Sequence, residues 1–192
     1  MSADTNTRSY ETWMVDSREE VVLVDEDDRE VGLAPKLLAH QRGLLHRAFS
    51  VFVLNAAGQV LLQRRASGKY HSGGLWTNTA CGHPRPGEPV AAAARRRLRE
   101  EMGFDCALTP AGSFLYRREV GGALVEHELD HVFHGRHEAA PHPDVSEVSE
   151  WRWAAPADAL ADAEAHPDRY TPWFALAMAE LIEADGFSLA AA

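Results

Sequence analysis

The residues with the clearest capacity for chemistry lie between Trp76 and Pro84, where the chain reads WTNTACGHP. This stretch places the thiol of Cys81 two residues before the imidazole of His83. An ionised thiol can move a proton or attack carbon, and an imidazole can hold a metal ion. A Cys-x-His pair is common by chance, so its meaning depends on the other reactive residues of the chain.

Two histidines and two glutamates elsewhere could complete a metal site with this imidazole. His40 and His46 are badly spaced for one helix face, so we expect them to flank a turn. Glu126 and Glu128 lie in an expected strand at 123–135, whose two-residue period puts both carboxylates on one face. Imidazoles suit Zn²⁺, and carboxylates extend the set toward Mn²⁺. The candidate ligands are His40, His46, His83, Glu126 and Glu128.

The alternative for this set is chance grouping, because the chain has ten histidines. A Glu-x-Glu pair alone is also a weak signal, since most such pairs face solvent. We interpret the remaining histidines as surface or packing residues: His71, His127, His131, His134, His137, His142 and His166.

A segment rich in arginine and glutamate follows the thiol. We predict a helix at 89–102, because proline favours the first turn and Gly103 stands just past the end. From Gly82 the chain reads G-x5-E-x7-R-R-L-R-E-E-M-G-F, which resembles the Nudix box, G-x5-E-x7-R-E-U-x-E-E-x-G-U, where U is apolar. One fixed position departs, because Arg97 stands where the family has a glutamate that helps to bind Mg²⁺. The resemblance implies a retained Nudix fold with impaired hydrolysis and an added cation for a diphosphate.

The elements that position these residues mix strands with helices. Strands are expected at 20–25, 48–54, 59–63, 104–108, 111–120, 123–135 and 147–153, with a short extended piece at 75–80. Helices are expected at 35–40, 89–102, 157–164 and 171–184. The pattern predicts an α+β fold, and the resemblance implies a Nudix-like α/β/α sandwich with a mixed β-sheet. We expect a flexible arm at 1–18, a single catalytic domain at 19–185 and a tail at 186–192.

The composition narrows the class of function. A chain of 192 residues suits one domain with a real core. The formal net charge of -10 argues against nucleic-acid and membrane partners, whereas clustered cations such as Arg64, Arg65 and Lys69 suit a small anionic ligand. The sequence has no apolar run of transmembrane length, so we expect no membrane-spanning helix, and its first residues lack the apolar core that a signal peptide would have. With only two cysteines, the sequence is typical of proteins that reside in the reducing cytoplasm.

Taken in chain order, these motifs are similar to those of type 1 isopentenyl diphosphate isomerases over roughly residues 20–175. The resemblance implies an enzyme that interconverts isopentenyl and dimethylallyl diphosphate through a tertiary carbocation, in isoprenoid biosynthesis. It makes Cys81 the proton-transfer residue on one face of the substrate. Glu128, helped by Tyr116, serves the opposite face.

The same resemblance assigns the substrate-binding residues. Lys36, Arg65, Lys69 and Arg97 match its diphosphate-binding positions, and Trp173 matches its aromatic wall. Trp76 is a weaker candidate that we interpret as core. Mg²⁺ held by Glu101 and the backbone carbonyl of Cys81 would bridge protein and diphosphate. The second cysteine, Cys106, is expected to be a buried structural thiol in a strand.

Two other functions stay open at this point. A Nudix hydrolase acting on a nucleoside diphosphate derivative would share the fold, although Arg97 and the Cys81/His83 pair count against it. A metal-dependent binding or sensor module would need no Cys81, Tyr116 and Glu128. We expect a monomer whose partner is a small isoprenoid diphosphate.

Overall fold

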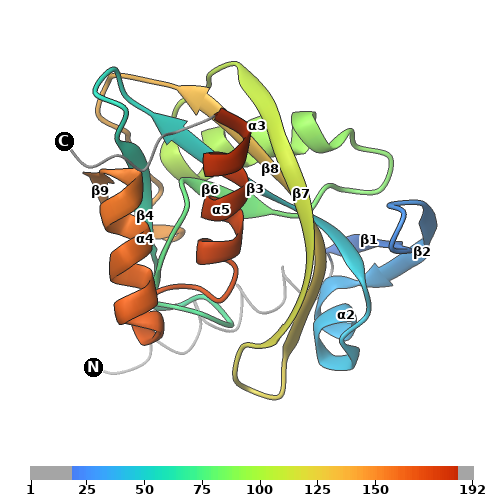
Figure 1. Cartoon of the computed structure of the whole chain (residues 1–192). Coiled ribbons are helices and arrows are strands. Elements are labelled where there is room, and N and C mark those ends of the chain that lie inside the picture. The colour runs from blue at the N-terminus through green and yellow to red at the C-terminus, as the bar shows by residue number, and fades with distance from the viewer. Residues whose placement is uncertain (1–18, 186–192) are drawn as a thin grey trace, which may run out of the picture.

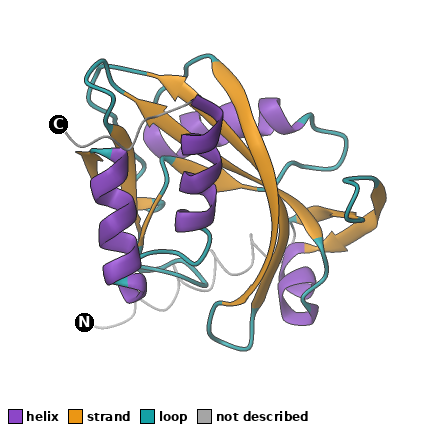
Figure 2. Cartoon of the chain, in the orientation of Figure 1, coloured by secondary structure: helices purple, strands orange, loops and turns teal. Residues whose placement is uncertain are grey.

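A single mixed sheet forms the centre of this computed structural model, which describes residues 19–185 (Figure 1, Figure 2). The expected arm at 1–18 and tail at 186–192 lie outside the described residues. Within the described range, every helix is too short or too polar to span a bilayer.

The sheet has nine strands arranged around β3. The strands are β1 (Glu20–Val24), β2 (Glu30–Pro35), β3 (His46–Leu54), β4 (Val60–Arg65), β5 (Trp76–Thr77), β6 (Ala80–Gly82), β7 (Leu108–Glu119), β8 (Val125–Arg136) and β9 (Val148–Ala154). The helices are α2 (Lys36–Arg42), α3 (Val90–Met102), α4 (Pro156–Ala165), the 3-10 turn η1 (Pro167–Arg169) and α5 (Phe174–Asp185). β3 runs parallel to β8 along its whole length and antiparallel to β1, β4 and β6.

Alternating side chains of β3 build two cores, one on each face of the sheet. Phe49 and Val51 pack toward α3 and its buried Leu98. Phe52 and Leu54 pack on the other face, against residues of α4 and α5. Figure 1 shows α4 and α5 in front of the sheet and α3 behind it. The predicted α/β/α sandwich with a mixed sheet is therefore confirmed.

Helix α3 begins and ends close to the predicted residues. Gly103 adopts a left-handed φ of 75°, and its N–H donates to the carbonyl of Arg99 at 3.1 Å. A Cβ at this position would lie 2.3 Å from the carbonyl oxygen of His142, so only glycine fits here. The helix thus stops where the motif predicts, and its last turns present Arg97 and Glu101 toward the cleft.

Two predictions about the strands need correction. One strand forms where two were expected at 104–108 and 111–120, because residues 104–107 are loop; β7 begins at Leu108 and pairs with β8 across an irregularity between Pro110 and Gly112. Continuous pairing with β8 carries the strand past the proline. Strand β2 was not predicted, because Gly32 and Pro35 interrupt its pattern; it pairs with β1. The remaining expected elements are confirmed, with ends that differ by a few residues.

Candidate active site and metal centre

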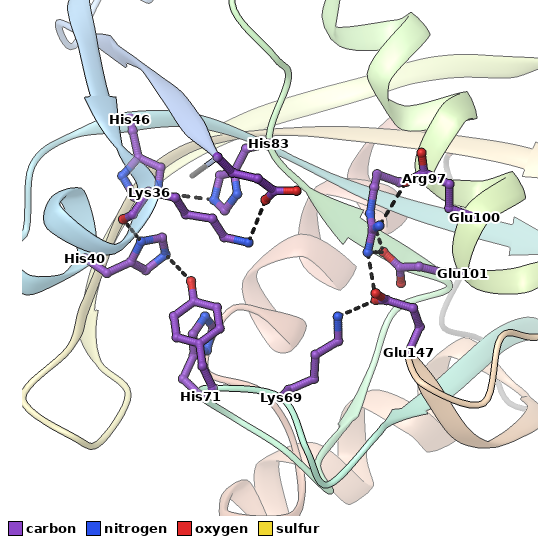
Figure 3. Close-up of polar contacts among 12 residues, drawn as sticks. Lys36, His40, His46, Lys69, His71, His83, Arg97, Glu100, Glu101 and Glu147 are labelled. Atoms are coloured by element: carbon purple, nitrogen blue, oxygen red, sulfur yellow. Dashed lines mark hydrogen bonds and ion pairs between the residues drawn. The ribbon is translucent and has the colours of Figure 1, made fainter. Parts of the chain in front are cut away.

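A cleft of about 720 Å³ lies beside β3, which contributes Ala48 and Phe49 to its lining, and β6, β8, α2 and α3 contribute further side chains. Its size is typical of sites for small ligands. The predicted site residues that line it are Lys36, Arg65, Lys69, Cys81, His83, Arg97, Glu101, Glu126, Glu128 and Trp173. Figure 3 shows the imidazoles on one side of the site, with Arg97 and Glu147 on the other.

The five predicted metal ligands converge, with ligand atoms that all lie within 4.8 Å of one another. His46 Nε2 lies 3.2 Å from His83 Nε2, which lies 2.8 Å from Glu128 Oε1. His40 Nε2 lies 3.1 Å from Glu126 Oε2. Five donors from α2, β3, β8 and the segment after β6 therefore face one point.

Backbone contacts fix the orientation of two imidazoles. His40 Nδ1 lies 2.7 Å from the carbonyl oxygen of Lys36, and His46 Nδ1 lies 2.8 Å from that of Leu44. A carbonyl can only accept, so each Nδ1 carries the proton, and each Nε2 is left with its lone pair toward the cluster. Such outer contacts are typical of histidines that bind metals.

The charges and the unpaired atoms of the cluster fit a divalent cation. Burial lowers the pKa of His83 to about 3, which keeps this imidazole neutral. Burial opposes ionisation of Glu128, but the contacts from His46 and His83 hold the pKa of this carboxyl well below its usual range. Oε2 of Glu126 is buried and has no hydrogen-bond partner. The neutral imidazole of His83, an anionic carboxylate and an unsatisfied carboxylate oxygen are donors that Mn²⁺ or Zn²⁺ would use.

Tyr116 belongs to this cluster through Glu128. The two residues are paired in the β7–β8 register, and the Tyr116 hydroxyl donates to Glu128 Oε2 at 2.5 Å. Burial and the charge of Glu128 raise the pKa of Tyr116 well above its ordinary value. The phenol therefore stays protonated and donates a hydrogen bond to the carboxylate.

Cys81 approaches the cleft from β6, whereas Glu128 approaches it from β8; both strands pair with β3. Cys81 pairs with Ser50 in the β3–β6 register. Burial raises the pKa of the Cys81 thiol to about 12, so the thiol is protonated at neutral pH. Arg65 Nη1 lies 3.7 Å from the sulfur and would stabilise a thiolate.

A network of charges surrounds the far end of the cleft. Arg97 donates to Glu100 at 2.9 Å, to Glu101 at 3.0 Å and to Glu147 at 2.8 Å. Lys69 also pairs with Glu147 (Figure 3). Although burial opposes it, the charges of Arg97 and Lys69 lower the pKa of Glu147 to about 2. The cations of this region are thus held in place by carboxylates.

Two tryptophans occupy the positions that the sequence suggested. Trp173 is 4% exposed, lines the cleft and donates from Nε1 to Asn78 at 3.2 Å. The Arg65 guanidinium lies 5.5 Å from the centroid of its ring. Trp76 packs against the core formed with α4 and α5 and contacts Arg152, which confirms its interpretation as core.

Three residues of the site escaped the sequence interpretation. Of the two interpretations of His71, surface or packing, burial excludes the first, and neither includes its contact beside the cleft, where Nε2 lies 3.0 Å from Glu126 Oε1. Glu147 was noted only as the start of a strand. Asp130 accepts a hydrogen bond from Ser50 at 2.8 Å, and burial and Glu128 raise its pKa well above the usual range.

One thiol was placed in the wrong element. Cys106 lies in the loop before β7 and not in a strand, although it packs against the α3 side of the core as expected. Burial raises its pKa. It has no place among the residues that line the cleft.

Comparison with known proteins gives the family of the chain. A model of the NUDIX domain matches residues 44–174. Isopentenyl-diphosphate Delta-isomerase 2 of Aromatoleum aromaticum is 52% identical over 164 residues, which cover 85% of this chain and 87% of that protein. An isopentenyl-diphosphate Delta-isomerase of Nocardia farcinica is 51% identical over 157 residues, 81% of this chain and 90% of that protein.

Solved structures support the fold independently. The crystal structure of DR0079 from Deinococcus radiodurans matches with a TM-score of 0.71 at 22% identity, covering 85% of this chain and 99% of that one. The MutT protein of Methanosarcina mazei matches with a TM-score of 0.61 at 18% identity, covering 75% and 96%. At these identities the likeness concerns the fold alone. The identity to curated relatives and the matched domain together show that the chain belongs to the isopentenyl-diphosphate Delta-isomerase family of NUDIX-domain proteins.

Proposed function

We propose that this chain interconverts isopentenyl diphosphate and dimethylallyl diphosphate by adding and removing protons. The relatives that carry this activity in their names share about half of its residues over most of its length. The observation that carries the proposal is the placement of two proton-handling groups in one cleft. Cys81 reaches it from β6 and Glu128 reaches it from β8, with Tyr116 of β7 hydrogen-bonded to Glu128.

The cations of the cleft bind the diphosphate in this proposal. Arg97 and Lys69 lie at one end, where Glu147 holds both. Lys36 and Arg65 also line the cleft. Arginine and lysine form charge-assisted hydrogen bonds with phosphate oxygens. Binding at this end would direct the five-carbon tail toward Cys81 and Trp173.

The reaction requires one proton to enter and one to leave. The alkene takes a proton at its terminal methylene carbon, which leaves a tertiary cation. The methylene next to the carbon that bears the diphosphate then loses a proton, and a new double bond forms. Cys81 handles the proton on one face of the substrate, with Arg65 to stabilise the thiolate. Glu128 handles the other, with Tyr116 hydrogen-bonded to it.

A carbocation must be protected from water and from nucleophiles. The ring of Trp173 is almost fully buried at the wall of the cleft. An aromatic face attracts a cation without forming a bond to it. We assign Trp173 this stabilising role.

We propose two metal sites. His40, His46, His83, Glu126 and Glu128 would hold Mn²⁺ or Zn²⁺, which makes a bound carboxyl group more acidic. Glu101 and the backbone carbonyl of Cys81 would hold Mg²⁺, which neutralises diphosphate charge.

The hydrolase alternative lacks a matching metal cage. Arg97 places a guanidinium among Glu100, Glu101 and Glu147, where consensus Nudix boxes have another carboxylate. We further propose that residues 19–185 form a single catalytic domain. We also propose that the protein is a monomer and is located in the cytoplasm. The net charge of -10 supports a partner that is neither nucleic acid nor membrane. The small number of cysteines supports a reducing compartment.

Product analysis tests the proposal directly. The purified protein is incubated with isopentenyl diphosphate, Mg²⁺ and Mn²⁺, and the products are separated by mass and retention time. We expect dimethylallyl diphosphate of unchanged mass. Release of phosphate or of a free alcohol would favour the hydrolase.

A further inference from the structure

The loop between β4 and β5 carries a histidine that the proposed reaction does not use. Arg65 and Gly74 close this loop, because the Gly74 N–H donates to the Arg65 carbonyl at 3.0 Å and the Arg65 N–H donates to the Leu75 carbonyl at 2.9 Å. Arg65 Nη2 also donates to the carbonyl of His71 at 3.4 Å. The position of the His71 backbone is therefore fixed by its contact with Arg65 and by the hydrogen bonds that join the two ends of the loop.

The imidazole of His71 contacts a predicted metal ligand. Its Nε2 lies 3.0 Å from Glu126 Oε1, and the two side chains are 6% and 3% exposed. The other ring nitrogen, Nδ1, lies 3.2 Å from the hydroxyl of Ser72. A hydroxyl donor at Nδ1 leaves the single proton of a neutral ring on Nε2, where it points at Glu126.

The two oxygens of Glu126 consequently have different surroundings. Oε1 faces His71, whereas Oε2 lies 3.1 Å from His40 Nε2 and has no hydrogen-bond partner. We propose that His71 is a positioning residue of the metal centre, which holds Oε1 of Glu126 so that Oε2 is presented to the metal. This inference rests on the proposed metal site. It adds to that site a partner outside the five ligands.

Physical chemistry gives the expected size of the effect. A carboxylate that is free to rotate loses entropy when it binds a metal, and a hydrogen bond made beforehand removes part of that cost. Removal of such an outer partner typically lowers metal affinity by about 10- to 100-fold. Because both groups are buried, water cannot easily replace the lost donor.

Packing is the competing explanation for a buried histidine. The ring of His71 meets the ring of Trp173 edge to face at 6.2 Å and that of Tyr70 at 4.4 Å. Figure 3 shows His71 close to His40, on the metal side of the site. A variant that keeps an aromatic ring but loses the donor separates packing from positioning.

The experiment compares His71→Phe and His71→Gln with the wild-type chain. Phenylalanine keeps the ring and removes the N–H, whereas glutamine restores a donor near the position of Nε2. His137→Phe is the matched control, because His137 stacks on Phe104 at 3.9 Å and lies outside the cleft. Dissociation constants for Mn²⁺ and for Zn²⁺ are measured by chelator competition. Melting temperatures are measured with and without metal.

We expect His71→Phe to weaken metal binding by about 10- to 100-fold, and His71→Gln to recover most of the loss. His137→Phe should bind metal like the wild type. Without metal, His71→Phe should melt below the wild type because Glu126 loses a buried donor, whereas His71→Gln should melt close to it. The gain in melting temperature on adding limiting metal should be smaller in His71→Phe than in the wild type.

Two results would overturn the positioning role. Unchanged metal affinity in His71→Phe would leave His71 as packing alone, and loss of metal from both variants would make it a direct ligand. Failure of the wild type to isomerise isopentenyl diphosphate while these affinities change would instead refute the proposed function and leave the positioning role intact.

Discussion

Replacement of Arg97 by methionine should destabilise the protein far more than the same change at Arg95 on the same helix. The Arg97 guanidinium lies 2.7 Å from Glu101 and 2.8 Å from Glu147, and the Glu101 side chain is only 4% exposed. Without Arg97, Glu101 keeps one close donor, the Gln63 amide at 2.5 Å. A buried carboxylate would then lack a matching charge.

The magnitude follows from burial. Breaking a buried pair by removing one partner costs about 3–5 kcal/mol. Arg97 and Glu147 are 21% and 23% exposed, so we expect the lower end, about 3 kcal/mol. Arg95 pairs with Asp105 at 50% and 30% exposure, and such surface pairs contribute about 0–1 kcal/mol. Methionine suits both positions because its helix propensity is close to that of arginine.

Urea denaturation at pH 7 measures both variants against the wild type. We expect the free energy of unfolding to fall by about 3 kcal/mol in Arg97→Met and by less than about 1 kcal/mol in Arg95→Met. Equal losses in the two variants would refute the reasoning, because they would mean that the buried contacts of Arg97 stabilise the fold no more than the exposed pair of Arg95 and Asp105 does.

Three further predictions concern the site. Arg97→Glu should raise the Michaelis constant for isopentenyl diphosphate, with a loss on the order of 2–4 kcal/mol; an unchanged constant would leave Arg97 outside the substrate site. Elemental analysis should find less bound metal in His46→Ala than in the wild type, and equal contents would contradict the proposed ligand set. Because Glu147 has a pKa of about 2 in the folded chain against an ordinary 4.5, its charge stabilises the fold above pH 4.5 and progressively less as the pH falls toward 2. The stability difference between wild type and Glu147→Gln should therefore shrink below pH 4.5 from at most about 3 kcal/mol, and a constant difference would contradict this origin.

The convergence of the two candidate carboxylate ligands could be predicted because their local pattern is regular. Strand alternation places Glu126 and Glu128 on one face, and the structure has both buried at the same site. The same alternation continues to Asp130, so the signal for this third carboxyl was present. By itself, a third acidic residue in a strand does not differ from one that faces solvent.

Other site residues could not be found from local sequence. His71 lies in a loop, and its approach to Glu126 depends on how the loop folds over the sheet. Glu147 meets Arg97 and Lys69 only because β9 pairs with β4 and brings its start to the cleft. These contacts join segments that are far apart in the chain. No periodicity or spacing encodes them.

Strand β2 could not be predicted from the sequence because it lacks a clear local pattern. β2 pairs with β1 across a turn where Asp28 has a left-handed φ of 61°. Its side chains Val31 and Leu33 are exposed, so the strand lacks the buried face that produces a clear pattern. By contrast, the proline and glycine that bound α3 act locally, and that helix was predicted almost to the residue.

The most direct test of the proposed mechanism is the reaction in heavy water. Dimethylallyl diphosphate formed by this chain should carry deuterium in the methyl group made from the former terminal methylene, because the entering proton comes from solvent-exchangeable groups such as Cys81. Cys81→Ala should abolish turnover while the fold and the metal content stay unchanged. Product without deuterium would contradict protonation from the enzyme, and full activity in Cys81→Ala would contradict the role assigned to the thiol.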